Sequence, residues 1–245
     1  FCAFDHVHSF PIMINWIDQN RLIRYLKGMQ NINRFIEHTN LKPTLTGRDV
    51  DQLIREAKQH QLLGICVPPF WVKRAKREIG DAETQLVTVI GFPLGYNMTE
   101  TKIEEMKLAI RDGADELDLV INSSAFKEGM NWPKIEIAKC SKLAHDEYKI
   151  LKVIIETAYL NDDEIKGLCR ICADAGVDYV KTSTGFAPEG AKVEHIQLMR
   201  SELPSNVGIK ASGGIKTFDQ AVALINAGAD RIGTSTGIDI ANGSK

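Results

Sequence analysis

The chain has 245 residues, of which 44% are hydrophobic and 25% charged, and it carries a formal net charge of −2. This composition is typical of a globular protein with a large core, and the balanced charge excludes the broad basic surface that attracts nucleic acid or an anionic membrane. The chain contains no run of about 18 apolar residues and begins without a signal-peptide pattern, so we expect a cytoplasmic protein with no membrane or nucleic-acid partner.

Residues 1–34 precede the repeating pattern that fills the rest of the chain. Short stretches at 16–18 and 21–26 are compatible with one or two helices. We interpret the segment as a short N-terminal helical extension that covers the bottom of the main domain or contributes to a subunit contact.

From residue 35 onward, apolar runs typical of buried parallel strands alternate with amphipathic stretches typical of helices. The strands are predicted at 35–39, 63–68, 86–92, 116–122, 150–157, 179–183, 207–212 and 231–235. The helices are predicted at roughly 48–61, 70–79, 101–112, 132–146, 162–175, 191–202 and 217–227. Capping boxes that begin three of these helices are predicted at Thr101 with Glu104, Asn161 with Glu164, and Thr217 with Gln220.

A short turn signal recurs three times between a helical stretch and a strand. Gly113, Gly176 and Gly228 each follow an amphipathic stretch and stand two residues before an aspartate. Glycine just beyond a helix adopts the left-handed conformation that ends the helix, so the repeat indicates a βα unit. Eight strands with intervening helices predict an α/β fold, a TIM (β/α)8 barrel forming one domain at 35–245. An open doubly wound sheet is the alternative, but no G-x-G-x-x-G turn follows a strand.

Three predicted strands carry a lysine among apolar neighbours, which is unusual because lysine is rarely buried without a partner or a task. These residues are Lys152, Lys181 and Lys210, and Asp118 occupies a similar position on another strand. Each lysine taken alone fits a strand end from which the ammonium reaches solvent. Alternate residues of a barrel strand point inward, so the matching phase predicts that the four side chains converge.

Such a cluster has a chemical use. A lysine attacks a carbonyl group only as the neutral amine, whereas a free lysine is almost wholly protonated at neutral pH. Burial and a second cation both lower the pKa of a lysine, and a nearby carboxylate can transfer protons. The cluster therefore predicts a Schiff-base nucleophile with its activator, although spacing alone leaves open which of Lys181 and Lys210 is the nucleophile.

Glycine-rich turns with hydroxyl side chains follow the last predicted strands. Glycine lets the backbone approach an anion and present N–H groups, and phosphate sites of these barrels lie after strands seven and eight. We therefore expect a phosphorylated substrate at this end of the barrel. The predicted binding residues are Thr184 and Gly185 after strand six, Gly213 and Gly214 after strand seven, and Ser235 and Thr236 after strand eight.

Several segments resemble the signatures of the deoxyribose-phosphate aldolase family, a class I aldolase family on a TIM barrel. They are KTSTG at 181–185, LKVIIET at 151–157, KASGG at 210–214, DELD at 115–118, and EHT at 37–39 with LKP at 41–43. The resemblance covers about residues 35–240. It implies reversible cleavage of 2-deoxy-D-ribose 5-phosphate to D-glyceraldehyde 3-phosphate and acetaldehyde, without a cofactor or a metal, by a homodimer or homotetramer.

The resemblance also implies roles for individual residues. Lys181 is the Schiff-base lysine, Lys210 perturbs it and helps to transfer protons, and Asp118 is the acid/base carboxylate. Lys152 corresponds to a supporting polar residue near Asp118 and is grouped with the substrate-binding residues. Gly185, Gly213, Gly214 and Ser235 correspond to phosphate-loop positions. The family usually has aspartate where this chain has Glu37, and leucine where it has Asn40, which predicts altered polar contacts at the end of the first strand.

Three other functions remain alternatives. A different class I phosphosugar aldolase would use the same barrel and lysines. A phosphosugar-binding sensor would keep the phosphate loops but would not need reactive amines. A metal-dependent hydrolase could use His6 and His8, an H-x-H pair, but needs further ligands at later strand ends, where only His38 is available.

Overall fold

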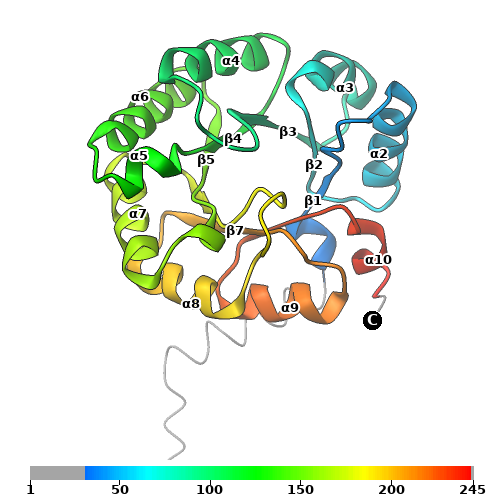
Figure 1. Ribbon diagram of the computed structural model, residues 1–245. Helices are drawn as coiled ribbons and strands as arrows, with labels where there is room; N and C mark the ends of the chain where they lie inside the picture. Colours follow the sequence, from blue (N-terminus) through cyan, green and yellow to red (C-terminus); the bar gives the residue numbers. More distant parts are fainter. Residues whose placement is uncertain (1–30, 244–245) are drawn as a thin grey trace, which may run out of the picture.

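We describe residues 31–243 of a computed structural model of the chain. Eight parallel strands pair in chain order, and the eighth pairs with the first, so the sheet closes into a barrel (Figure 1). The strands are β1 (Ile36–Thr39), β2 (Gly64–Val67), β3 (Gln85–Ile90), β4 (Glu116–Val120), β5 (Ile150–Ile154), β6 (Tyr179–Lys181), β7 (Gly208–Ser212) and β8 (Arg231–Thr234). The predicted (β/α)8 fold is confirmed, although several predicted strands extend too far at their carboxyl ends.

Helices surround the barrel as an outer layer, which Figure 1 shows. They are α2 (Gly47–Gln59), α3 (Val72–Ile79), α4 (Thr99–Arg111), α5 (Ser123–Lys127), α6 (Trp132–Asp146), α7 (Asp162–Asp174), α8 (Val193–Glu202), α9 (Phe218–Ala227) and α10 (Gly237–Ala241). Short 3-10 helices occupy Ile32–Phe35, Pro69–Trp71 and Thr157–Tyr159. The sequence did not predict α5 or α10, because a five-residue helix is too short to show a helical period.

Capping boxes fix the starts of several helices. The predicted boxes at Asn161 and Thr217 are present, and a further box joins Thr46 to Asp49 at the start of α2. The box predicted at Thr101 is wrong, because α4 begins at Thr99 and its N-cap residue, Met98, makes no side-chain cap. A capping box satisfies backbone N–H groups that otherwise lack partners, so it fixes where a helix leaves its loop.

The main core lies between the strands and the helices. Outward-facing strand residues such as Leu117, Val153 and Ile209 are fully buried there against apolar helix faces. A smaller apolar cluster of Cys66, Val87 and Val89 belongs to the barrel interior. Paired residues of neighbouring strands point to the same side of a sheet, and Val89 pairs in register with Asp118. One side of the interior is therefore apolar and the other is charged.

A buried ion pair joins two helices outside the barrel interior. Lys102 of α4 donates to Glu136 of α6 at 2.7 Å and to the Val120 carbonyl at 2.9 Å. The hydroxyl of Thr99 donates to the second oxygen of the same carboxylate at 2.9 Å. Buried charges of this kind persist only when they are paired, so this pair fixes α4 and α6 against the end of β4.

Part of the predicted N-terminal extension falls within the described residues. Ile32 is buried in the main core, and the Asn33 carbonyl accepts a hydrogen bond from the backbone of Leu63. The stretches at 16–18 and 21–26 lie outside the described residues. Among the helices of residues 31–243, none has the length and apolar character that a membrane span requires.

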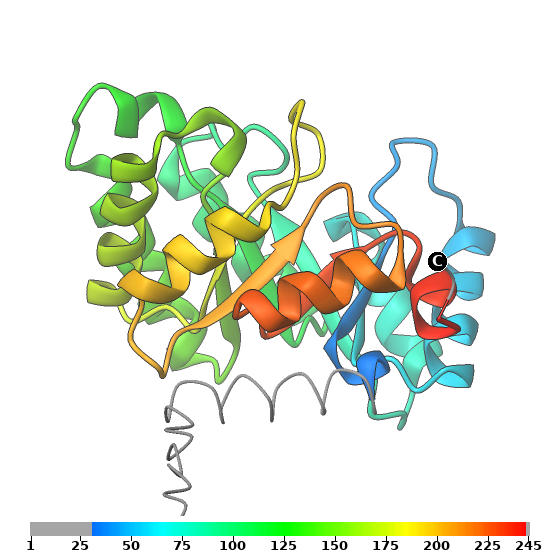
Figure 2. The same cartoon turned by 90° about the horizontal axis from the view of Figure 1, so that it is seen from below.

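Two loops project from the end of the barrel at which the strands finish. Figure 2 shows the loop that follows β1, in blue, and the loop that follows β6, in yellow, on the same side of the molecule. Functional residues of this fold lie at the carboxyl ends of the strands, where such loops gather. We therefore expect the functional site to lie between these two loops.

Candidate active site

Three charged side chains from three strands meet inside the barrel. Asp118 of β4 accepts hydrogen bonds from Lys181 of β6 at 2.8 Å and from Lys210 of β7 at 2.7 Å, both on Oδ2. Lys181 and Lys210 are also direct neighbours in the strand register. The structure thus brings together the three residues predicted to be catalytic, because each occupies a position of its strand that faces the barrel interior.

A second layer of charge surrounds this group. Lys152 Nζ lies 3.0 Å from Asp118 Oδ1, 2.5 Å from Glu116 and 3.5 Å from Glu37. Glu37 also forms a close ion pair with Lys210, and Arg231 approaches both glutamates at 3.8 to 3.9 Å. Sequence reasoning did not assign Glu116 and Arg231 to the site, although each stands two residues before an inward-facing position. It expected only altered polar contacts at Glu37.

The charges of this network balance when one amine is neutral. The network contains four basic side chains, Lys152, Lys181, Lys210 and Arg231, and three carboxylates, Glu37, Glu116 and Asp118. With one lysine uncharged, three cations face three anions. An unbalanced charge inside a protein is costly, so the environment favours the loss of one proton from the lysine that is held least tightly.

The direction of the pKa shifts identifies that lysine as Lys181. Burial lowers the pKa of Lys181, and the neighbouring Lys210 lowers it further, against the opposing effect of Asp118. Lys210 is equally buried, but Asp118 and Glu37 together raise its pKa. Lys181 contacts one carboxylate whereas Lys210 contacts two, so Lys181 loses its proton first.

Lys152 and Asp118 remain charged. Burial opposes the charge on Lys152, but Asp118, Glu37 and Glu116 hold its pKa well above the usual value. Burial likewise opposes ionisation of Asp118, yet Lys152, Lys181 and Lys210 hold its pKa well below the usual range. Lys152 is completely buried beneath Asp118 and is not part of the cavity wall, so its contacts are those of a supporting residue.

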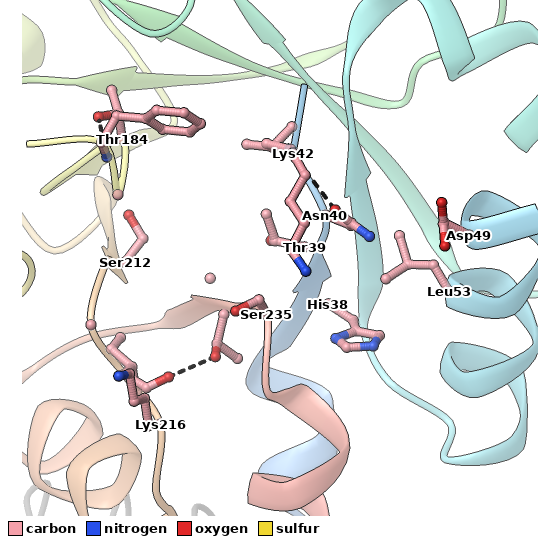
Figure 3. Close-up of a pocket in the computed structure, with 18 of the residues that line it drawn as sticks. His38, Thr39, Asn40, Lys42, Asp49, Leu53, Thr184, Ser212, Lys216 and Ser235 are labelled. Atoms are coloured by element: carbon pink, nitrogen blue, oxygen red, sulfur yellow. Dashed lines mark hydrogen bonds between the residues drawn. The ribbon is translucent and has the colours of Figure 1, made fainter. Parts of the chain in front are cut away.

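A cavity of about 610 Å³ opens above the network. Of the three inward lysines, Lys181 alone belongs to its wall; Lys152 and Lys210 are hidden beneath. The opposite wall comes from the loop after β1 and from α2. Figure 3 shows the side chain of Lys42 reaching from that loop into the cavity toward Ser235. A carbonyl compound in the cavity therefore meets the amine of Lys181 before that of Lys210.

Glycines after β6 and β7 form a backbone surface on another side of the cavity. Gly185, Gly213 and Gly214 line it, and all three have positive φ, between 74° and 87°. The turns approach each other so closely that a Cβ on Gly213 would lie 3.0 Å from the Gly190 Cα. Side chains are therefore absent where an anion could contact backbone N–H groups.

Hydroxyl groups of the predicted binding residues differ in their orientation. Ser235 lines the cavity, as does Thr234, which was not predicted. Thr236 is not part of the wall, and its hydroxyl lies against Thr234 and the Ile215 carbonyl. Thr184 lines the cavity, but its hydroxyl donates a hydrogen bond to Glu156. Thr184 therefore offers an incoming ligand an oxygen lone pair and no donor.

Of the three histidines named for the metal-dependent alternative, only His38 falls within residues 31–243. His6 and His8 lie outside the described residues, and His38 points away from the charged network to contact Glu56 of α2 at 2.9 Å. Between residues 31 and 243, no group of histidine, cysteine and acidic side chains has an arrangement suited to a metal ion.

A buried, depressed-pKa amine beside a carboxylate and a glycine-rich anion surface suits Schiff-base chemistry on a phosphorylated carbonyl compound. The family model for the DeoC/LacD family aldolases matches residues 12–243. The chain belongs to the DeoC/LacD aldolase family. The match begins upstream of residue 35, inside the segment predicted to be an extension.

Individual members of the DeoC/LacD family are similar over most of their length. The deoxyribose-phosphate aldolases of Thermococcus gammatolerans and Brevibacillus brevis are each 46% identical to this chain, across 88% of it and 97% of theirs. The solved tetrameric deoxyribose phosphate aldolase of Aeropyrum pernix is 32% identical, with a TM-score of 0.84 over 91% of this chain and 96% of that one. The chain is therefore an aldolase with the same barrel, a carbon–carbon lyase.

Proposed function

We propose that this protein is a deoxyribose-phosphate aldolase that cleaves 2-deoxy-D-ribose 5-phosphate into D-glyceraldehyde 3-phosphate and acetaldehyde through a Schiff base on Lys181. The observation that carries the proposal is the position of Lys181, the inward lysine that both reaches the cavity and has a lowered pKa. The names of the relatives from Thermococcus and Brevibacillus support the choice of substrate.

The reaction begins when the neutral amine of Lys181 attacks the C1 aldehyde of the open-chain sugar. The carbinolamine that forms loses water to give the imine, and a proton must reach the departing hydroxyl group. Lys210, which contacts the same oxygen of Asp118 as Lys181 does, supplies this proton. General acid catalysis of this kind contributes roughly 10²- to 10⁴-fold to a rate.

Cleavage then breaks the C2–C3 bond of the imine. The C3 hydroxyl loses its proton and becomes the aldehyde of glyceraldehyde 3-phosphate, while the bonding electrons form an enamine on C1 and C2. Protonation of C2 and hydrolysis of the resulting imine release acetaldehyde and restore Lys181. Asp118 lies 2.8 Å from Lys181 Nζ and is the group that passes protons within the network.

The phosphate is assigned to the glycine turns. Gly185, Gly213 and Gly214 present backbone without side chains to the cavity, and Ser235 also lines it. Lys42 and Lys216 line the same cavity and supply positive charge. An anion bound there would keep the sugar chain directed toward Lys181, which is the positioning that makes the attack efficient.

A panel of sugar phosphates tests the substrate. We expect purified protein to release acetaldehyde from 2-deoxyribose 5-phosphate, and the Lys181→Met variant to release none. Cleavage of a longer ketose or aldose phosphate with no release of acetaldehyde would instead support the other class I phosphosugar aldolase. Binding of sugar phosphates without turnover would support a sensor.

We further propose that the chain assembles as a homodimer or homotetramer, in keeping with the tetramer named for the relative from Aeropyrum. The barrel of residues 35–245 forms the catalytic domain in this proposal, and residues 1–34 form an extension to it. Light scattering of the purified protein at several concentrations checks the assembly. A monomer at every concentration would contradict it.

A further inference from the structure

Glu156 has an unusual backbone conformation where the chain leaves β5. It is one of the non-glycine residues with positive φ, at 53° with ψ of 71°. This left-handed conformation is unfavourable for a residue with a side chain and persists only where the surroundings hold it. The following residue, Thr157, donates its backbone N–H to the Thr182 carbonyl, so the turn lies against the end of β6.

The side chain of Glu156 reaches the loop that follows β6. Its Oε2 accepts a hydrogen bond from the backbone of Thr184 at 3.1 Å and a short one from the Thr184 hydroxyl. The oxygen of that hydroxyl in turn accepts the backbone N–H of Phe186 at 3.1 Å. One carboxyl group therefore fixes the turn Thr184–Phe186, and all three residues of this turn line the cavity.

The location of this carboxyl group is costly to maintain. Glu156 is only 4% exposed, and burial raises its pKa. Its other oxygen, Oε1, is buried with no hydrogen-bond partner within the described part of the chain. A surface loop needs no such group, because its backbone can be solvated by water. The arrangement therefore indicates that a defined position of the turn matters.

The turn that Glu156 holds forms one half of the glycine surface. A Cβ on Gly213 would lie 3.5 Å from the Gly185 Cα, so the turns after β6 and β7 pack side by side. Gly185 has no side chain of its own to fix its position. Its place relative to Gly213 therefore depends on the hydrogen bonds of its neighbour, Thr184, to Glu156.

We propose that Glu156 is a positioning residue for phosphate recognition, which acts by holding the turn at Gly185 against the turn at Gly213. The proposal rests on the proposed function, in which these glycines bind the phosphate of the substrate. It predicts that loss of the carboxyl group weakens binding of phosphorylated substrate and leaves the chemistry at Lys181 intact.

Three variants of the hydrogen-bonded pair test the proposal. Glu156→Ala removes the carboxyl group, Glu156→Gln keeps a carbonyl oxygen that can accept both hydrogen bonds, and Thr184→Val removes the hydroxyl with little change of shape. Glu189→Ala is the matched control, since it removes an exposed carboxylate from the same loop. Glu189 pairs with Lys192 and does not line the cavity.

The readout is cleavage of 2-deoxyribose 5-phosphate compared with cleavage of unphosphorylated 2-deoxyribose. We expect Glu156→Ala to raise KM for the phosphate ester about tenfold with kcat nearly unchanged, the pattern of lost substrate binding. Cleavage of 2-deoxyribose should change less than about twofold, and Glu156→Gln should restore most of the affinity. Thr184→Val should raise the same KM, and the double variant Glu156→Ala with Thr184→Val should be no worse than the poorer single variant.

Other outcomes overturn the proposal. An unchanged KM for 2-deoxyribose 5-phosphate in Thr184→Val would overturn it even if Glu156→Ala failed to fold. An equal loss of activity on 2-deoxyribose 5-phosphate and on 2-deoxyribose would overturn it as well. Trapping of acetaldehyde on Lys181 by borohydride is measured in parallel on every variant. If the wild type traps acetaldehyde and the variants keep their affinity, only the positioning role fails; if the wild type traps none, the proposed function fails instead.

Discussion

Lys210 keeps Lys181 unprotonated in this account, and its replacement tests that role at the level of one residue. Lys210→Leu removes the like charge and leaves Oδ2 of Asp118 to Lys181, so both changes raise the pKa of Lys181. Activity requires the neutral amine, which forms only as pH rises through that pKa. We therefore expect the acid limb of the kcat/KM profile to move to higher pH and the rate at neutral pH to fall by orders of magnitude.

Lys210→Arg is the matched control, because arginine keeps the positive charge at this position. Its acid limb should stay near that of the wild type even if the rate falls. Equal displacement of the limb in both variants would exclude an electrostatic role for Lys210. Calorimetric unfolding of each variant checks that the protein still folds when Asp118 and Glu37 lose Lys210 as a partner.

Asp118 has a different role and gives a different prediction. Asp118→Asn keeps the size of the side chain but removes its capacity to accept and return a proton. We expect the variant to form the imine with acetaldehyde at a measurable rate while turnover of the sugar phosphate falls by about 10²-fold or more. Full turnover in Asp118→Asn, measured by acetaldehyde release, would count against the proton-transfer role.

The sequence predicted the central residues but not their surroundings. The lysines and Asp118 were visible because a charge within an apolar strand is rare, and the strand period placed them inward. Glu116 and Arg231 stand at strand starts, where charges are common, so a charge there does not by itself indicate a site residue. The contact of Glu156 with Thr184 depends on a left-handed turn, and the prediction of a continuous strand over 150–157 concealed it.

At the scale of elements, the glycine turns after β6 and β7 depend on close backbone contact. A Cβ on Gly190 would lie 2.0 Å from the Gly213 carbonyl oxygen. Gly190→Ala must therefore push the two turns apart. We expect the variant to bind 2-deoxyribose 5-phosphate at least about tenfold more weakly, since a misplacement of 1 Å can cost that much or more.

Gly167→Ala provides the control for this substitution. Gly167 lies within α7, and a Cβ there would have its nearest neighbour, Phe126, 4.0 Å away. Alanine in a helix interior favours the helix by up to about 1 kcal/mol, so this variant should unfold at the same or a higher temperature and keep its affinity. If Gly190→Ala also keeps its affinity, measured by competition with inorganic phosphate and by KM, the glycine turns do not bind the phosphate.

Elements differ in how well their sequences specify them. The bounds of long amphipathic helices such as α2 and α7 were predicted within a few residues, because apolar residues recur at helical spacing over several turns. The short helices α5 and α10 have no such signal. The start of α4 was misplaced because Thr101 and Glu104 match a capping box in sequence while the chain is already helical at Thr99.

At the scale of the whole molecule, the charged barrel interior makes stability depend on pH. Burial opposes ionisation of Glu37 and Asp118, yet lysines hold both pKa values below those of free carboxyl groups. A depressed pKa in the folded state stabilises the fold above the unfolded pKa, and that stabilisation is lost as pH falls through the folded pKa. We expect the free energy of unfolding to fall steeply below about pH 4.5, by up to about 1.4 kcal/mol per pH unit for each such group.

Urea unfolding between pH 3 and pH 7 measures this dependence. Glu37→Gln should make the free energy of unfolding depend less steeply on pH below pH 4.5, by the contribution of up to one titrating group. The variant should also be less stable at pH 7, because Lys210 and Lys152 lose a partner. Glu147→Gln, at an exposed position after α6, should leave the slope unchanged. Parallel curves for wild type and Glu37→Gln would show that Glu37 is not ionised against these lysines in the fold.

The proposed reaction depends on the neutral amine of Lys181, and reductive trapping tests for this amine most directly. Borohydride added together with acetaldehyde or 2-deoxyribose 5-phosphate reduces an imine to a stable secondary amine. We predict one adduct per chain, located by peptide mapping on Lys181 and absent from the Lys181→Met variant. An adduct on Lys210 or Lys152, or no adduct while the sugar phosphate is still cleaved, would contradict the account.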